Sequence, residues 1–283
     1  MRLLVITLMA FVAGCSTSFF QPSTALFHTP GQFGLDYEPV EIHAADGTEL
    51  FAWFLPARGK PRATVLYLHG NAENISTQFA NVAWMPARGF NVLALDYRGY
   101  GGSQGSPSFA GVQLDIDAAM RALLARPDVD PDRIIVFGQS LGAALAVHYV
   151  AHSPYRSSVR AVVLDSPFSD YRGIVREKLA GFFLTWPFQW IARITVENDY
   201  SPSASVEAIA PIPVLFIHGD DDLVVPPHHS QRLYERAREP KELWVLPDIG
   251  HIQAVRNREV RERLAHFLER HSAESAAVGA SSR

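Results

Sequence analysis

Short apolar runs alternate with amphipathic stretches along most of this 283-residue chain. Continuous apolar runs rich in β-branched residues are typical of strands buried on both faces, and they lie at residues 64–69, 91–96, 134–137, 161–165, 213–217 and 243–246. Residues 75–88 and 109–125 instead place apolar side chains at helical spacing. Strands that alternate with helices predict an α/β fold with a mostly parallel, doubly covered sheet.

The two ends of the chain depart from this alternation. Residues 37–43 and 49–55 predict an opening hairpin, with Asp46 and Gly47 in its turn. Residues 252–270 predict a closing helix, and the small polar residues from 272 to 283 predict a disordered tail. The region between them is long enough for one α/β domain.

Composition narrows the class of protein. Hydrophobic residues make up 48% of the chain, enough for one sizeable core. Charged residues make up 19%, the formal net charge is −4, and no basic stripe favours a nucleic-acid partner. The single cysteine excludes an internal disulfide framework and a four-cysteine zinc site.

The most informative motif is a serine between two glycines. Residues 138–142 read Gly-Gln-Ser-Leu-Gly, after the apolar run 134–137 and before an alanine-rich stretch typical of a buried helix. In this context the motif favours a nucleophile elbow, whose sharp turn exposes the hydroxyl of Ser140. An ordinary turn between a strand and a helix is the alternative interpretation.

A serine hydroxyl needs a base, and the base needs an orienting group. Residues 218–226, which read His-Gly-Asp-Asp-Asp-Leu-Val-Val-Pro, follow one apolar run, and His251 follows Gly250 shortly after the next. The order serine, aspartate, histidine is the order used by α/β-hydrolases.

Three more motifs carry a resemblance to that family. Residues 66–74 read Leu-Tyr-Leu-His-Gly-Asn-Ala-Glu-Asn, residues 95–103 read Leu-Asp-Tyr-Arg-Gly-Tyr-Gly-Gly-Ser, and residues 165–168 read Asp-Ser-Pro-Phe. With these motifs the chain resembles the α/β-hydrolase superfamily, and within it the bud-emergence ("Bem"-like) branch of serine hydrolases, from about Val40 to about Leu268. The resemblance implies the α/β-hydrolase fold and acyl-enzyme chemistry without a cofactor.

The resemblance also implies roles for single residues. Ser140 is the expected nucleophile and His251 the expected base. The family pattern His-Gly-x-x-Asp-x-x-Val-Pro falls on Asp222 as the orienting carboxylate. Asp220, Asp221 and Asp248 are then turn or solvated residues, and Asp165 is the alternative acid.

The expected oxyanion donors are backbone N–H groups. Leu141 begins the helix after the elbow, where free N–H groups carry partial positive charge. The resemblance places the second donor at Asn71, with Ala72 as the alternative. His69 is expected to support this loop by a hydrogen bond. We expect no metal site, because His148 and His152 lack further ligands and His228 and His229 are typical of a helix start.

Residues 171–201 interrupt the alternation after the strand at 161–165. In this fold such an insertion usually forms a small cap over the nucleophile. Its apolar side chains are Phe182, Phe183, Leu184, Trp186, Phe188, Trp190 and Ile191. Lining a pocket for acyl groups, packing within the cap and contact with a membrane are the three interpretations left open.

The N-terminus resembles a bacterial lipoprotein signal. A short positive start and an apolar run too short to span a bilayer precede residues 12–15, Val-Ala-Gly-Cys. The resemblance implies cleavage after residue 14, lipid on Cys15 and membrane attachment, and Ser16 after the cysteine favours the outer membrane facing the periplasm. A plain secretory signal or a short anchor helix is the alternative. We expect a signal at 1–14, a tether at 15–35, the hydrolase domain at 36–271 and a tail at 272–283.

The sequence therefore predicts a serine hydrolase for an ester, thioester or amide, anchored in the bacterial envelope, with a small-molecule or acyl-containing substrate. A lipid-anchored binding protein that has lost catalysis is the alternative. The triad residues and elbow glycines are all present, which counts against it. A peptidase or thioesterase is not excluded, because the same machinery serves these reactions.

Overall fold

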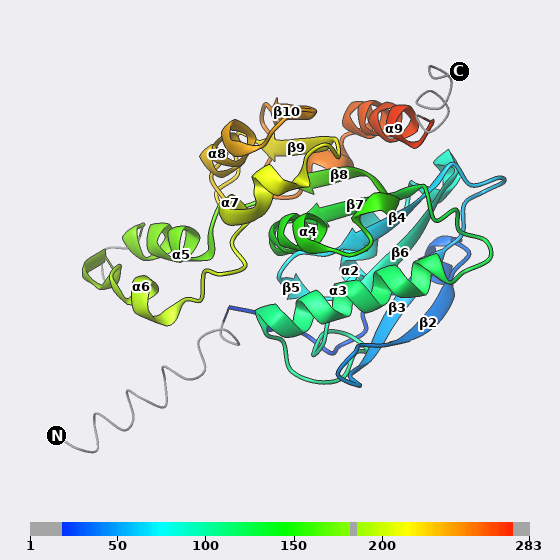
Figure 1. Cartoon of the computed structure of the whole chain (residues 1–283), viewed down its shortest axis with the longest axis horizontal. Coiled ribbons are helices and arrows are strands. Elements are labelled where there is room, and N and C mark those ends of the chain that lie inside the picture. Colours follow the sequence, from blue (N-terminus) through cyan, green and yellow to red (C-terminus); the bar gives the residue numbers. More distant parts are fainter. Residues whose placement is uncertain (1–18, 182–185, 274–283) are drawn as a thin grey trace, which may run out of the picture.

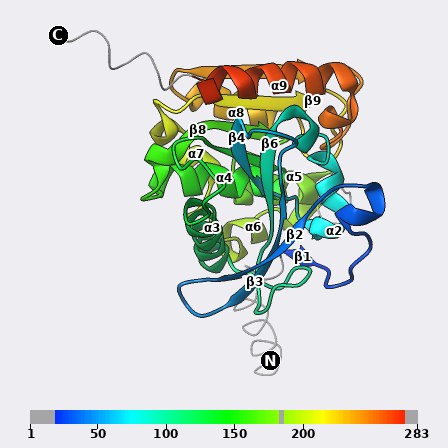
Figure 2. The same ribbon diagram turned by 90° about the vertical axis from the view of Figure 1, so that its right-hand side faces the viewer.

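The computed structural model describes residues 19–181 and 186–273, which build an eight-stranded sheet with helices on both faces (Figure 1, Figure 2). The strand order is β10-β9-β8-β7-β4-β6-β3-β2. β3 pairs antiparallel with both β2 and β6, and the other neighbouring strands are parallel. The strands are β2 (Glu38–His43), β3 (Glu49–Leu55), β4 (Ala63–Leu68), β6 (Phe90–Asp96), β7 (Ile134–Gln139), β8 (Val159–Asp165), β9 (Val214–Gly219) and β10 (Lys241–Leu246). The predicted doubly covered parallel sheet is confirmed.

Two apolar clusters lie on opposite faces of the sheet. One packs α3 (Phe109–Leu124), α4 (Leu141–His152) and α8 (His228–Arg236) against one set of strand side chains. The other packs α9 (Arg258–Ala273) and the segment after β4 against the alternate set. Because successive strand residues point to opposite faces, an uninterrupted apolar strand feeds both clusters.

The chain order creates a switch point between β4 and β7. After β4 the chain adds β6 on one side, and it then crosses to place β7 on the other side of β4. In open α/β sheets, ligands bind beyond the carboxyl ends of the strands at such a point. The ends of β4 and β7 lead into the loop at Asn71 and into Ser140, so the topology brings these segments together.

The helix predicted at residues 75–88 is wrong. This stretch contains only α2 (Ile75–Gln78), η2 (Phe79–Asn81) and η3 (Pro86–Arg88). The carbonyl of Asn81 accepts the indole N–H of Trp84 at 3.0 Å, and Pro86 has no N–H with which to continue a helix. The closing helix also begins later than predicted, because η7 (Ala254–Arg256) precedes α9.

The tether expected at residues 15–35 is not borne out from residue 19 onward. Phe20 is buried, and Gln21–Pro22 (β1) pairs in parallel with Ala72–Glu73 (β5). We call residues 19–27 the strap. η1 (Pro30–Phe33) follows it. The aromatic side chains at the start of the segment bury apolar surface against the domain, whereas a flexible linker would stay in solvent. Cys15 and the signal at 1–14 lie outside the described residues.

The cap projects from the body of the molecule (Figure 1). Its described helices are α5 (Tyr171–Ala180), η5 (Trp186–Phe188) and α6 (Ile191–Thr195), and the chain returns through α7 (Pro202–Ser205) and η6 (Val206–Ile209). A further turn, η4 (Arg156–Ser158), precedes β8. Within the described ranges, no helix has the length and apolar character needed to cross a bilayer.

Candidate active site

Ser140 occupies a strained turn between β7 and α4. Its backbone has φ 52° and ψ −113°, in the left-handed half of conformational space that non-glycine residues rarely adopt. The flanking glycines are required by close packing. A Cβ on Gly138 would lie 2.4 Å from the carbonyl oxygen of Gly142, and a Cβ on Gly142 would lie 2.0 Å from that of Leu68. The predicted strand–turn–helix elbow is confirmed.

His251 lies between Ser140 and Asp222. Its Nε2 is 2.9 Å from Oγ of Ser140, and its Nδ1 is 2.7 Å from Oδ2 of Asp222. An ionised carboxylate only accepts hydrogen bonds, so Nδ1 carries the proton and Nε2 is free to accept the serine proton. Ser140 and Asp222 are buried, and the imidazole is 16% exposed. The three side chains singled out in the sequence therefore meet in one hydrogen-bonded chain.

Asp222 is held as a carboxylate by its surroundings. Its Oδ1 accepts the backbone N–H groups of Val224 at 2.9 Å and Val225 at 2.8 Å. Burial alone would raise its pKa, but hydrogen bonds from His218, His251 and Val225 together hold the pKa of Asp222 well below its ordinary value. Asp222 therefore stays charged at any pH at which His251 could act as a base.

The alternative acids have other partners. Asp165 accepts Nε2 of Gln139 at 2.8 Å, and burial raises its pKa to about 6. Asp220 accepts the backbone N–H of Asp248 at 2.8 Å, which ties two loops together. Asp222 is the acid whose geometry suits a role in orienting His251.

The expected oxyanion donors face the same cavity as Ser140. Asn71 and Leu141 both line it, and within the described part of the chain neither backbone N–H has a hydrogen-bond acceptor. Leu141 is the first residue of α4, where the helix leaves its N–H groups free. Ala72, the alternative donor, also lines the cavity but belongs to β5, which pairs with β1.

Side chains that the sequence did not single out hold the Asn71 loop. Gln78 accepts the N–H of Gly70 at 2.8 Å through Oε1 and donates to the carbonyl of Ala72 at 2.5 Å. Nδ1 of His69 donates to the carbonyl of Gly70 at 2.7 Å, and burial lowers the pKa of His69 to about 4. His69 therefore supports the loop as a neutral ring, as expected. No local pattern marks Gln78, because its partners lie in a loop rather than at helical spacing.

His218 supports the acid loop in the same way. Its Nε2 donates to the carbonyl of Val225 at 2.7 Å and lies 3.3 Å from Oδ2 of Asp222, while its Nδ1 accepts the hydroxyl of Ser230 at 2.6 Å. The sequence placed His218 within a family motif but did not predict this contact.

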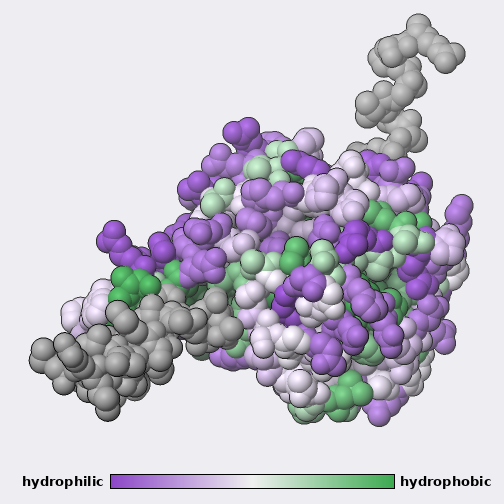
Figure 3. Space-filling view, turned by 60° about the horizontal axis from the view of Figure 1, so that its bottom comes forward, coloured by the Kyte–Doolittle hydropathy of each residue, from purple (hydrophilic) through white to green (hydrophobic). Residues whose placement is uncertain are grey.

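A cavity of about 720 Å³ opens at Ser140. Apolar side chains line it from the strap, from the segment after β8 and from the cap, and they include Phe19, Phe168 and Ile174. The described cap aromatics do not line it. Trp186, Phe188 and Trp190 are 62%, 49% and 61% exposed, which contradicts a lining or packing role for them. Phe182, Phe183 and Leu184 lie outside the described residues. Figure 3 shows hydrophobic surface at the projecting end of the molecule.

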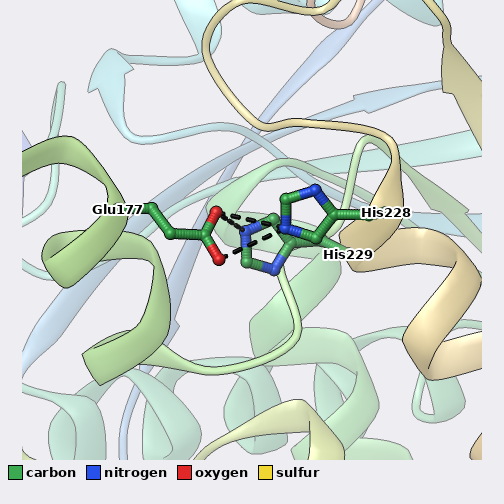
Figure 4. Close-up of side chains that lie close together, drawn as sticks. All are labelled: Glu177, His228 and His229. Atoms are coloured by element: carbon green, nitrogen blue, oxygen red, sulfur yellow. Dashed lines mark hydrogen bonds and ion pairs between the residues drawn. The ribbon is translucent and has the colours of Figure 1, made fainter. Parts of the chain in front are cut away.

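One cluster outside the cavity has metal-ligand chemistry. Glu177 of α5 lies 3.1 Å from Nε2 of both His228 and His229 at the start of α8 (Figure 4). Nδ1 of His229 accepts the backbone N–H of Ser169 at 3.1 Å, so its Nε2 carries the proton that is donated to Glu177. A metal would need the opposite tautomer, and Arg232 also lies 3.4 Å from Glu177. The cluster therefore suits a clamp between the cap and α8.

Comparison with known proteins identifies the family to which this fold belongs. Residues 59–210 match the family model described as serine aminopeptidase, S33. The uncharacterized protein YfhR of Escherichia coli K12 is 39% identical over 238 residues, covering 82% of this chain and 80% of YfhR. The protein bem46 of Schizosaccharomyces pombe is 32% identical over 223 residues, covering 77% and 71% of the two chains.

Solved structures show the same likeness. A Pyrococcus furiosus esterase, Pf2001, superposes with a TM-score of 0.70 and 25% identity over 90% of this chain and 98% of that one. From the family match, the bem46-type relatives and the fold, we conclude that this chain belongs to the serine aminopeptidase S33 family of α/β-hydrolases, on its Bem-like branch, and that it is a hydrolase enzyme.

Proposed function

We propose that the protein is a serine hydrolase that cleaves an ester of a small or acyl-containing molecule through an acyl-enzyme. The observation that carries this proposal is the chain of contacts from Asp222 through His251 to Ser140, at 2.7 Å and 2.9 Å. His251 accepts the serine proton as Ser140 attacks the carbonyl carbon, and it then protonates the leaving alcohol. Water then attacks the acyl-enzyme, with His251 again accepting the proton, and this step releases the acid and restores Ser140.

The N–H groups of Asn71 and Leu141 stabilise the charge that develops on the carbonyl oxygen. Such donors act most strongly when they are held in place before the reaction begins. Both groups lack another acceptor among the described residues and line the cavity beside Ser140. The nucleophile, base and oxyanion donors all come from the chain, so the proposed reaction includes no cofactor.

An ester is favoured over a peptide with a free amino terminus. An aminopeptidase must hold a substrate ammonium group, which requires acidic side chains near the nucleophile. The charged side chains that line the cavity are Glu73, Lys178, Arg256 and Arg261, so cations outnumber the single carboxylate. Like charges would repel an ammonium group. Thioesters remain within the chemistry of the same site.

Labelling with a fluorophosphonate probe tests the mechanism. We expect wild-type protein to be labelled on Ser140, and we expect Ser140→Ala and His251→Ala to lose labelling and turnover of p-nitrophenyl butyrate. His266→Ala, at a ring that is 78% exposed, is the matched histidine control and should retain both. Folded wild-type protein that takes no label would refute the proposal.

We further propose that the enzyme is attached to the bacterial envelope through lipid on Cys15, facing the periplasm from the outer membrane. Phe19 lies four positions after Cys15, and four steps along the chain extend at most about 14 Å. Phe19 lines the cavity, so the anchor would hold the cavity near the bilayer surface. The exposed Trp186 and Trp190 suit the same interface.

Metabolic labelling with palmitate in a bacterial host tests the anchor. We expect the wild-type chain to incorporate label and to sediment with outer membranes. Cys15→Ala should lose the label, and esterase activity in the soluble fraction should rise. Wild-type protein that carries no lipid would contradict this part of the proposal and leave the catalytic part intact.

A further inference from the structure

The strap makes more hydrogen bonds to the Asn71 loop than its loop-like composition suggests. Nδ2 of Asn71 donates to the carbonyl of Phe19 at 2.7 Å, and Oδ1 of Asn71 accepts the N–H of Gln21 at 3.0 Å. Further along, Nδ2 of Asn74 donates at 2.8 Å to the carbonyls of both Ser23 and Ala25. The strap therefore contacts the loop on both sides of Ala72.

Tyr100 completes this arrangement from the other side. Its hydroxyl lies 2.9 Å from the carbonyl oxygen of Asn71 and 3.0 Å from its Oδ1, and it can donate to either. It also accepts the N–H of Gln21 at 3.2 Å. The ring is fully buried, and burial raises the pKa of Tyr100 above its ordinary range, so the hydroxyl keeps its proton as a donor. The side chain and the carbonyl of Asn71 are thus both hydrogen-bonded. Its backbone N–H has no acceptor among the described residues and remains available to a group bound in the cavity.

Aromatic packing fixes the beginning of the strap. The ring of Phe19 lies 5.2 Å from that of Tyr171 and 5.8 Å from that of Phe168, and the ring of Phe20 lies 5.2 Å from that of Phe109. These rings belong to the cap, the segment after β8 and α3. The strap therefore joins the Asn71 loop to the cap and to the segment after β8, which line the cavity, and also to α3.

We propose that the strap is a working part of the active site, which holds the N–H of Asn71 in the position needed to bind the oxyanion. The side chains of Asn71 and Tyr100 act as positioning groups, since neither touches the reacting atoms. The inference rests on the proposed esterase function. An oxyanion donor must be held within a few tenths of an ångström before the reaction, so a looser loop would cost rate more than substrate binding.

The test uses full-length Asn71→Ala and Tyr100→Phe, with Leu26→Ala as the control within the strap. Tyr100→Phe removes only the hydroxyl and keeps the packed ring. Leu26 is 62% exposed and has no side-chain partner in the described parts of the chain. We expect each loop variant to lower kcat for p-nitrophenyl butyrate about 10-fold, less than the loss of a whole donor, with KM changed less than two-fold.

Inhibition by a trifluoromethyl ketone gives the discriminating measurement, because its tetrahedral adduct places an oxyanion where the reaction does. We expect its inhibition constant to rise in parallel with the loss in kcat. Unchanged kcat and inhibition in both variants, with active wild type, would overturn the strap proposal alone. Wild-type protein without labelling at Ser140 would instead refute the esterase function.

A different observation leads to a second inference, about the substrate. Arg256, at the end of η7, and Arg261, near the start of α9, line the cavity. Across the described residues neither guanidinium has a hydrogen bond or ion pair, whereas the neighbouring Arg263 stacks 3.8 Å from the ring of Trp244. Lys178 of the cap lines the cavity too. The formal net charge of the chain is −4, so these cations are a local concentration of positive charge.

We infer that the natural ester carries an anionic group, a carboxylate or a phosphate, beyond an apolar section. Phe168, Ile174 and Val225 would contact the apolar section, and Arg256 and Arg261, which line the same cavity, would meet the anion. Arginine suits both anions because its planar fork matches their oxygens. This inference also depends on the proposed function.

Paired substrates test it. The ratio of kcat/KM for mono-p-nitrophenyl glutarate to that for p-nitrophenyl butyrate isolates recognition of the terminal carboxylate, and an ester ending in phosphate forms the second arm. We expect the double variant Arg256→Gln and Arg261→Gln to lower this ratio about 10-fold for the preferred anionic ester, through a higher KM for that ester. Added salt should lower the same ratio in wild-type protein. Arg258→Gln, at an exposed arginine that does not line the cavity, is the matched control.

An unchanged ratio in the double variant, for both anions, would overturn the inference while hydrolysis of the neutral ester upheld the catalytic function. Wild-type protein that does not hydrolyse the neutral ester would instead contradict the proposed catalytic function.

Discussion

Oδ2 of Asp222 lies 2.7 Å from Nδ1 of His251, and the other carboxylate oxygen accepts two backbone N–H groups from its own loop. The carboxylate is therefore fixed by the loop before it meets the imidazole. This arrangement distinguishes Asp222 from Asp220, which lies two residues away and binds the N–H of Asp248.

Asp222→Asn should lower kcat by about 10³- to 10⁴-fold, because an amide in this position favours the wrong tautomer of the histidine. Asp220→Asn is the matched control, since an amide oxygen still accepts the N–H of Asp248, and its kcat should stay within about two-fold of wild type. Steady-state kinetics with p-nitrophenyl butyrate measure both. Equal losses in the two variants would contradict the assignment of the acid.

Gly142→Ala should destabilise the fold by about 3 kcal/mol or more, because the new Cβ would lie 2.0 Å from a backbone oxygen that cannot move aside. Gly181→Ala tests the same substitution where φ is −71° and the nearest atom is 3.5 Å away, and it should be neutral within about 1 kcal/mol. Urea unfolding followed by circular dichroism compares them. A stable Gly142→Ala would show that the elbow tolerates a side chain.

Stability should depend on pH through His229. Burial lowers the pKa of His229 to about 4 from an ordinary value of 6.5. The carboxylate of Glu177 opposes this shift, whereas His228 and Arg232, which face the same carboxylate, add to it. Between these values the unfolded chain binds a proton that the folded chain does not. The folded state therefore loses up to about 1.4 kcal/mol per pH unit as pH falls from about 6.5 to 4.

His229→Gln should remove this contribution. Subtracting its urea-unfolding free energies from those of wild type, measured between pH 7.5 and 4.5, isolates the effect. Opposing contributions from Asp96 and Asp165, whose pKa values burial raises to about 7 and about 6, are common to both proteins and cancel. A difference that stays constant with pH would contradict the prediction.

The exposed cap aromatics should matter little for hydrolysis of a soluble ester. Trp186→Ala and Trp190→Ala should keep kcat/KM for p-nitrophenyl butyrate within about two-fold, because neither side chain lines the cavity. Phe168→Ala, at a buried ring that does line it, should lower kcat/KM by about ten-fold or more through lost apolar contact. A large loss in either tryptophan variant would show that these rings fold over the site.

The amino-acid sequence by itself determined the α/β sheet and singled out Ser140 and His251 as candidate reactive residues. Continuous apolar strands and a serine between two glycines are local patterns, and His251 could be picked out because it follows the end of a strand. Asp222 could be chosen only by resemblance, since three adjacent aspartates have the same local pattern, and their hydrogen bonds depend on how the loop folds.

Only the tertiary structure decided how the N-terminal segment and the cap relate to the site. Ser, Thr and Pro around Phe19 and Phe20 predict a tether, because composition does not reveal that Phe109, Phe168 and Tyr171 assemble a surface for these rings. Hydrogen bonds from Asn71 to residues 50 and more positions away depend on that packing. Contacts of such long range leave no periodic trace in the sequence, and they are the contacts that hold the Asn71 loop.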